Sequence, residues 1–256
     1  MERFINSPNL PENPISLAVV DGRITYEIEK KFFDLNIKII KTTKNKYLYD
    51  AISYHPDVVM HHLGNEEILA APNIDQKLVY DLEDNGFKIS YGKSYIEKKY
   101  PFDIPYNVAR FGNNAVCCIK YTDEILISEL YNRGINIIDV KQGYSKCSIC
   151  IVSDNAVITS DIGIHNTLMK NLIDCLLITP GNINLFEMNY GFIGGASGAI
   201  SRDRIAFFGD LGFHPNNIEI QKYLSKYNRK VENLCKIPLT DFGTLIPLKE
   251  YSILTI

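Results

Sequence analysis

The side chains with the greatest capacity for covalent chemistry in this 256-residue chain are its six cysteines. The ionised thiolate is the nucleophilic form of cysteine, so a reactive cysteine needs surroundings that favour that form. Residues 107–152 hold the clearest supersecondary pattern in the chain and, at Cys147, its best candidate nucleophile. The alternative is that Cys147 is a buried strand thiol. Cys117, Cys118 and Cys175 fall in predicted strands, where we expect small core residues.

Cys147 and Cys150 have the spacing of a metal-binding or redox pair, but their surroundings do not support either use. Residues three apart in an extended strand point to opposite faces, and neither a second CxxC nor a suitably placed histidine follows. We therefore expect no metal site and no cofactor. Because the N-terminus does not resemble an export signal, we also expect six free thiols rather than disulfides.

A second pattern with chemical potential, Asp-x-Gly-x-His, occurs twice, as Asp161 to His165 and as Asp210 to His214. Each copy follows the second strand of a predicted hairpin, so related units would place these side chains at equivalent strand ends. Asp161, Asp210 and His214 are therefore candidate substrate-binding residues on one face. The alternative is that each aspartate caps the helix that follows it, which is a common role of aspartate at such a position.

A recurring pattern of secondary structure positions these residues. In residues 107–140, two apolar runs around a Gly112-Asn113 turn predict a hairpin. A helix should follow, with Thr122 as its N-cap and Gly134 at its end, and then a final strand. The same ββαβ order recurs with turn centres 41 to 49 residues apart, which is typical of repeated supersecondary units. The five units span residues 16–42, 57–92, 107–140, 147–179 and 196–234.

The two ends of the chain complement each other. The first unit nearly lacks its second hairpin strand, whereas residues 243–256 hold two apolar runs, Thr244 to Leu248 and Tyr251 to Leu254, without a helix. Pairing of the N- and C-terminal strands would close the units into a ring and remove exposed sheet edges. We predict an α/β fold of five ββαβ units, an α/β-propeller, in one domain, residues 1–256. The alternative is a chain of two α/β domains joined through residues 92–106.

Composition excludes some classes of function. The chain is 46% hydrophobic and 22% charged, with a net charge of −3 and its Lys and Arg scattered, so we expect no nucleic-acid partner. No apolar run approaches the roughly 20 residues that a bilayer span needs, so we expect no membrane partner. The expected compartment is the cytoplasm. A small-molecule substrate is the expected partner, and a homo-oligomer is compatible with the sequence.

The predicted architecture resembles the pentein superfamily of guanidino-group-modifying enzymes, which includes deiminases, dimethylargininases and amidinotransferases. In the deiminases a His-x-Asp triplet opens one unit, and here His55-Pro56-Asp57 opens the segment HPDVVMHHLGNEEILAAP. A later unit of that family leads through a glycine-containing loop to the nucleophilic cysteine. In this chain KQGYSKCSIC, with Gly143 and Cys147, follows the unit of residues 107–140.

This resemblance implies Cys147 as the nucleophile, His55 as a general acid/base and Asp57 as a carboxylate that binds a guanidinium group. A thiolate can attack the guanidinium carbon while an imidazole protonates the leaving amine. The implied function is a cysteine-dependent hydrolase or transferase acting on a small guanidino or amidino compound. At the positions that match a second substrate carboxylate, the chain has Ser16, Asn107 and Ser197. The alternative is a catalytically inactive binding or scaffold protein with the same fold.

Overall fold

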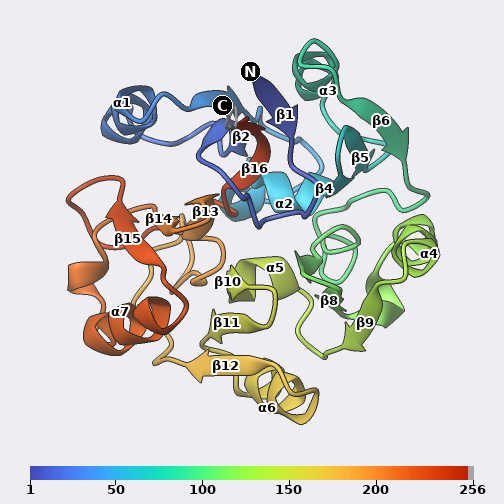
Figure 1. Cartoon of the computed structure of the whole chain (residues 1–256). Helices are drawn as coiled ribbons and strands as arrows, with labels where there is room; N and C mark the ends of the chain where they lie inside the picture. The colour runs from blue at the N-terminus through green and yellow to red at the C-terminus, as the bar shows by residue number, and fades with distance from the viewer. Residues whose placement is uncertain (253–256) are drawn as a thin grey trace.

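The computed structural model describes residues 1–252, which form five small sheets around a common centre (Figure 1). In four units the first two strands form an antiparallel hairpin, a helix follows, and the third strand pairs in parallel with the second. This order confirms the predicted α/β fold class. The second unit contains β4 (Met60–Gly64), β5 (Glu67–Ala70), α3 (Gln76–Glu83) and β6 (Lys88–Tyr91).

The next three units contain the same elements in the same order. The third contains β7 (Ala109–Phe111), β8 (Asn114–Cys117), α4 (Glu124–Asn132) and β9 (Asn136–Asp139). The fourth contains β10 (Ile149–Ser153), β11 (Ala156–Thr159), α6 (Ile162–Lys170) and β12 (Asp174–Leu177). The fifth contains β13 (Ser197–Ser201), β14 (Arg204–Phe207), α7 (Asn217–Lys226) and β15 (Lys230–Asn233). Single 3-10 turns occur at η1 (Asp50–Ile52), η2 (Ile119–Tyr121) and η3 (Leu211–Phe213).

The first unit is completed by the C-terminal end of the chain. Its own elements are β2 (Ile15–Val20), α1 (Tyr26–Asp34) and β3 (Lys38–Lys41), and β16 (Ile246–Tyr251) takes the place of the missing hairpin strand. β16 pairs antiparallel with β2 and, on its other edge, with β1 (Glu2–Phe4). The predicted pairing of the two ends is therefore present. Within residues 1–252 the five sheets stay separate and do not merge into one closed sheet.

Two further details concern the chain ends. At the N-terminus β1 forms because residues 2–4 find a free edge on β16. Of the two predicted closing runs, the first corresponds to β16. The second, Tyr251 to Leu254, extends into residues 253–256, which lie outside the described residues.

Local signals explain why each unit turns and stops where it does. In the second unit the hairpin turns at Gly64 and Asn65, which both have positive φ, a conformation that glycine and asparagine adopt most readily. The side chain of Asp75 caps α3 by accepting from Lys77 N. Each helix buries one apolar face; in α3 the buried residues are Leu78, Val79 and Leu82.

The beginnings of the second and fourth units, at residues 57 and 147, were predicted wrongly as strand, whereas His55 itself is extended. Each forms one turn of helix instead, α2 (Pro56–Val59) and α5 (Ser145–Ser148), and the strands begin after them at Met60 and Ile149. In α2 the proline occupies the first turn, where its fixed φ suits a helix and its missing N–H costs nothing. Asp57 and Cys147 therefore project from helical turns.

The cysteines are free thiols in the described chain. Cys117 and Cys175 are buried strand residues as expected, whereas Cys118 lies just beyond β8 and is half-buried. Among the described residues, no helix combines the length and apolar character needed to cross a lipid bilayer.

Candidate active site

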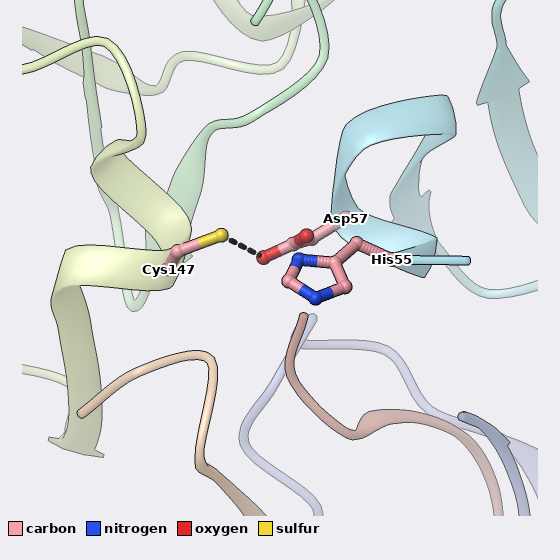
Figure 2. Close-up of side chains that lie close together, drawn as sticks. All are labelled: His55, Asp57 and Cys147. Atoms are coloured by element: carbon pink, nitrogen blue, oxygen red, sulfur yellow. Dashed lines mark hydrogen bonds between the residues drawn. The ribbon is translucent and has the colours of Figure 1, made fainter. Parts of the chain in front are cut away.

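Two one-turn helices from different units bring three reactive side chains together. His55 is the N-cap of α2 and Asp57 lies in its first turn, while Cys147 lies in α5. Figure 2 shows the Cys147 sulfur pointing across the gap between these helices toward Asp57 and the His55 ring. The sulfur, one carboxylate oxygen and one ring nitrogen lie within 4.8 Å of one another. Cys147 Sγ donates a hydrogen bond to Asp57 Oδ2 at 3.0 Å.

Asn107 fixes the distance between the two helices. It precedes β7, and its Nδ2 lies 3.3 Å from both the Asp57 carbonyl oxygen and Cys147 Sγ. Its Oδ1 accepts from the backbone N–H groups of Lys146 and Cys147 at 2.8 and 3.4 Å. One buried amide therefore contacts both halves of the site. The sequence showed Asn107 only as a position without an acid, and gave no sign that it would bridge the site.

The His55 ring is fully buried between two acids. Its Nε2 lies 3.9 Å from Asp21 Oδ2 and 4.0 Å from Asp241 Oδ1. Neither ring nitrogen has a hydrogen-bond partner in the part of the chain that the structure describes. Burial, assisted by the positive charge of Arg23, lowers the pKa of His55 to about 3, so the ring is neutral at pH 7. A neutral imidazole can accept a proton.

Asp241 is an acid of the site that sequence reasoning missed. Its Oδ2 accepts from Phe192 N and its Oδ1 from Gly243 N, both at 2.9 Å. Burial raises the pKa of its carboxyl to about 7. We had matched the start of the first unit to Ser16, but Asp241 precedes the strand that opens this unit, β16. The available signal was the closing strand itself, since aligning β16 with the other opening strands points to residues 241–245.

Burial keeps the resting thiol protonated. It raises the pKa of Cys147 well above its usual range, and the Asp57 and Asp241 carboxyls reinforce that shift. Burial also raises the pKa of Asp57 to about 6, although the positive charge of Lys146 opposes this change. The Lys146 ammonium itself is buried and donates to Thr244 Oγ1 at 2.5 Å. A cation placed beside the thiol would favour its ionised form.

A cavity of about 210 Å³ opens onto Cys147, His55 and Asp241. Apart from those three residues its walls are aromatic, aliphatic or neutral polar: Tyr49, Ile52, Tyr144, Leu185, Met188, Asn189, Tyr190 and Phe192. Leu185 to Phe192 belong to the long loop between the fourth and fifth units. A chamber of this size, with a nucleophile and acids at one end, can hold a small organic cation.

The other predicted substrate-binding residues lie elsewhere. Asp161 is the N-cap of α6, where its Oδ1 accepts from Ile164 N at 2.9 Å. Asp210 is the N-cap of η3 and accepts from Gly212 N at 2.8 Å. His214 ends η3, and its Nδ1 accepts from Asn216 N. None of the three lines the cavity beside Cys147. The structure therefore brings together Cys147, His55 and Asp57, but not Asp161, Asp210 and His214.

The same three reactive groups could also hold a metal ion. Within residues 1–252, His55, Asp57 and Cys147 form a compact set of donor atoms. A thiolate, an imidazole and a carboxylate are ligands that suit a divalent transition metal. The expectation that the site works without a metal or a cofactor stays a prediction.

Solved structures with a similar fold include amidinotransferases and an agmatine deiminase. An inosamine-phosphate amidinotransferase from Streptomyces griseus covers 98% of both chains with a TM-score of 0.58 and 10% identity. An amidinotransferase from Microseira wollei, of the saxitoxin biosynthetic pathway, matches over 98% of this chain and 99% of its own, with a TM-score of 0.56 and 12% identity. An agmatine deiminase from C. jejuni matches over 91% of both chains, with a TM-score of 0.55 and 11% identity. At these identities the likeness shows the fold alone, and it confirms the pentein fold.

Comparison of sequences adds the family but no activity. No functionally curated protein matches the chain. A family model described as "Family of unknown function (DUF6873)" matches residues 19–246, which is most of the chain. The chain belongs to this family of unknown function.

Proposed function

We propose that this protein is a cysteine-dependent enzyme that acts on a small guanidino or amidino compound, as a hydrolase or an amidinotransferase. One observation carries the proposal: a buried thiol, imidazole and carboxylate lie within 4.8 Å of one another. The solved structures with the same fold support the choice of substrate, since their names include amidinotransferases and an agmatine deiminase. Cys147 is the nucleophile, His55 the general acid/base and Asp57 a substrate-binding carboxylate.

Substrate binding supplies the charge that the resting site lacks. A guanidinium group is planar and cationic, so it pairs with carboxylates through charge-assisted hydrogen bonds. Asp57 provides one carboxylate and Asp241 the second. Asp241 replaces the acid that is missing at the matching positions, which are Ser16, Asn107 and Ser197. The bound cation lowers the pKa of the Cys147 thiol and of both acids by Coulomb attraction. The nucleophile therefore forms in the presence of its substrate.

The chemistry follows from these protonation states. The Cys147 proton passes to neutral His55, and the thiolate forms a C–S bond with the guanidinium carbon. The C–N bond to the leaving amine breaks as the His55 imidazolium returns the proton to that nitrogen. Asp21 and Asp241, each about 4 Å from Nε2, stabilise the transient imidazolium. Water in a hydrolase, or an acceptor amine in a transferase, then attacks the same carbon and releases the thiol.

Selective alkylation tests this proposal. 2-Chloroacetamidine carries the planar cation, and iodoacetamide is a neutral reagent for thiols. We expect chloroacetamidine to modify Cys147 first, located by peptide mass spectrometry, with Cys118 as the internal control because it is half-buried and lies outside the cavity. Iodoacetamide should prefer Cys118. Equal inertness of Cys147 to both reagents in the native protein would overturn the proposal.

The alternative is a binding or scaffold protein without chemistry. One observation favours this alternative: Cys147 is only 2% exposed, and its burial raises the pKa of the thiol and so keeps it protonated. The two functions differ in the response to a cation. A scaffold protein predicts that an amidinium group gives the reagent no advantage at Cys147, whereas the enzyme predicts a large one.

A further inference from the structure

The cavity beside Cys147 contains no positive side chain among the described residues. Its walls include one acid that points into the site, Asp241, and neither lysine nor arginine. A substrate carboxylate that enters this chamber loses its water without gaining an ion pair, which is costly. Asn189 is the sole side-chain amide of the described lining, and a neutral amide does not replace a guanidinium or an ammonium as a carboxylate partner.

Two positive side chains close to the site, Arg23 and Lys146, already have hydrogen-bond partners. Arg23 donates to both carboxylate oxygens of Asp21 and to the backbone carbonyls of Asp50 and Ala51. Its guanidinium also lies 4.9 Å from the Tyr54 ring centroid. Lys146 is buried and donates to Thr244 Oγ1. Neither side chain belongs to the cavity wall, so neither can meet an anion there without breaking its present contacts.

Two of the three phenols in the wall, those of Tyr49 and Tyr144, already have hydrogen-bond partners, and the third, Tyr190, lies at the mouth. Tyr144 donates to Asp103 Oδ2 at 2.5 Å, and its oxygen lies 2.9 Å from the Tyr49 hydroxyl. Because Tyr144 uses its only hydrogen on Asp103, Tyr49 must donate to Tyr144. Asp103 orients this pair of hydrogen bonds, and neither the Tyr49 nor the Tyr144 hydroxyl hydrogen remains available to a ligand. The rings of Tyr49 and Tyr144 therefore present apolar surfaces to the cavity.

Aromatic and aliphatic side chains form the outer part of the chamber. The Tyr144 and Phe192 rings stack with centroids 6.4 Å apart and planes at 30°, and Tyr190 meets Phe192 edge-on at 6.1 Å. Leu185 and Met188 lie on the same loop and face the same space. Met188 is 52% exposed and Tyr190 46%, which places them toward the mouth of the cavity. Such surfaces bind apolar groups and the faces of flat cations.

We infer that the site selects a guanidino or amidino compound whose far end is uncharged and apolar, and that it rejects compounds whose far end carries a carboxylate, free arginine included. This inference rests on the proposed function, in which Asp57 and Asp241 hold the cationic end at Cys147. The remainder of the substrate then lies between Tyr144, Phe192 and the loop that carries Leu185 and Met188.

A matched pair of ligands isolates the charge. 4-Guanidinobutanamide and 4-guanidinobutyrate have the same length and differ in one negative charge, and phenethylguanidine adds an aromatic end. Titration calorimetry on the Cys147→Ala variant measures binding without turnover. We expect the amide to bind at least ~10-fold more tightly than the carboxylate, and phenethylguanidine more tightly still, because a carboxylate without a partner loses its hydration. Equal or tighter binding of 4-guanidinobutyrate or arginine, or failure of all four ligands to bind, would overturn the inference.

Two variants test the wall itself. Met188→Arg adds a cation at the mouth and should raise the affinity for 4-guanidinobutyrate relative to the amide by ~10-fold. Ile218→Arg, on the exposed face of α7, adds the same charge outside the cavity and should leave the ratio unchanged. Phe192→Leu should lower the preference for phenethylguanidine, whereas Phe33→Leu, an exposed residue of α1, should not. If Met188→Arg left the affinity for 4-guanidinobutyrate relative to the amide unchanged, the assigned orientation of the substrate would be wrong.

The two proposals fail in different ways. If chloroacetamidine selects Cys147 but arginine binds as well as phenethylguanidine, the cysteine-dependent function stands and the specificity for an apolar end is wrong. If Cys147 is inert although apolar guanidines bind in the cavity, the chamber has the inferred selectivity without the proposed chemistry.

Discussion

Asp57 and Asp161 both lie at the beginning of a helix, yet their carboxylates are used in opposite ways. Asp161 Oδ1 accepts from Ile164 N and its Oδ2 from Gln142 Nε2, so both oxygens serve the local structure. Asp57 is buried; its Oδ2 meets the Cys147 thiol, and its Oδ1 has no partner within residues 1–252. A carboxylate with unused hydrogen-bonding capacity inside a protein is costly unless a ligand satisfies it.

The difference follows from where each aspartate stands in its unit. Asp57 precedes the first strand of the second unit, and Cys147 and Asn107 precede the first strands of their own units. These segments meet at the centre of the molecule (Figure 1). Asp161 and Asp210 follow the second strands, where the chain turns outward into helix or 3-10 turn. Residues before the first strand therefore supply the site, and residues after the second strand stabilise the turns.

The largest effect that this comparison predicts concerns the two acids as binding groups. Asp57→Asn removes the negative charge beside the thiol, so chloroacetamidine should lose its advantage while the reaction with iodoacetamide becomes easier. We expect the ratio of the two rate constants at Cys147 to fall ~100-fold, measured by mass spectrometry at pH 7.5. Asp161→Asn should leave the ratio within about twofold. A fall with Asp161→Asn equal to that with Asp57→Asn would remove the distinction.

The sequence predicted the order of the elements well because that order depends on local signals. Gly64-Asn65, Asp154-Asn155 and Gly134 mark turns or helix ends in both the sequence and the structure. It also singled out Cys147, His55 and Asp57 as candidate site residues, through a resemblance to penteins, and the structure places these three side chains together. The helical turns α2 and α5 were missed because apolar runs do not distinguish one buried helical turn from the start of a strand.

The rest of the site depends on contacts between distant units. Asp241 becomes a site residue only because β16 completes the first unit, which sets it 4.0 Å from His55. Asn107 contacts Cys147 forty residues along the chain, through a hydrogen bond that no spacing rule predicts. The repeated Asp-x-Gly-x-His pattern was the opposite case, since its regularity was visible but its aspartates cap the elements that follow.

Asp241 extends the comparison to the stability of the whole protein. Burial raises the pKa of the Asp241 carboxyl from its ordinary value of 3.8 to about 7 in the folded state. A carboxyl with a raised folded-state pKa stabilises the fold at low pH and loses that contribution as the pH rises through 7. The free energy of unfolding of the wild type, relative to Asp241→Asn, should therefore fall by about 2 kcal/mol between pH 5.5 and pH 8. Groups distant from Asp241 contribute equally to both proteins and cancel in this difference.

Chemical denaturation at several pH values measures that change. Asp241→Asn also loses one acceptor for Phe192 N or Gly243 N, so its absolute stability should be lower at every pH, and the informative quantity is the slope of the difference. A difference that stays constant from pH 5.5 to pH 8 would mean that Asp241 ionises as an ordinary surface acid and does not belong with Asp57.

Two glycines with the same backbone φ, one of them beside His55, sharpen the comparison through steric fit. A Cβ on Gly243 would lie 2.3 Å from Cβ and Cγ of His55, and the residue has φ of 68°. Gly134 has the same φ with nothing within 4 Å, so Gly134→Ala measures the backbone strain alone. We expect Gly243→Ala to slow the reaction of chloroacetamidine at Cys147 ~10-fold by displacing His55, and Gly134→Ala to leave it unchanged. Equal rates in the two variants would show that His55 needs no fixed position.

The smallest predicted effect tests the capping aspartates directly. Asp161→Ala removes the oxygens that hold Ile164 N and Gln142, so the free energy of unfolding should fall by about 1 kcal/mol, the usual cost of losing an N-cap. The affinity of the Cys147→Ala protein for phenethylguanidine should not change when Asp161→Ala is added, because Asp161 lies outside the cavity wall. Calorimetric titration and thermal unfolding of the double variant separate the two quantities. A loss of affinity for phenethylguanidine without a loss of stability would instead make Asp161 a substrate-binding residue, as the repeated Asp-x-Gly-x-His pattern first indicated. The proposed division between site residues and capping residues would then be wrong.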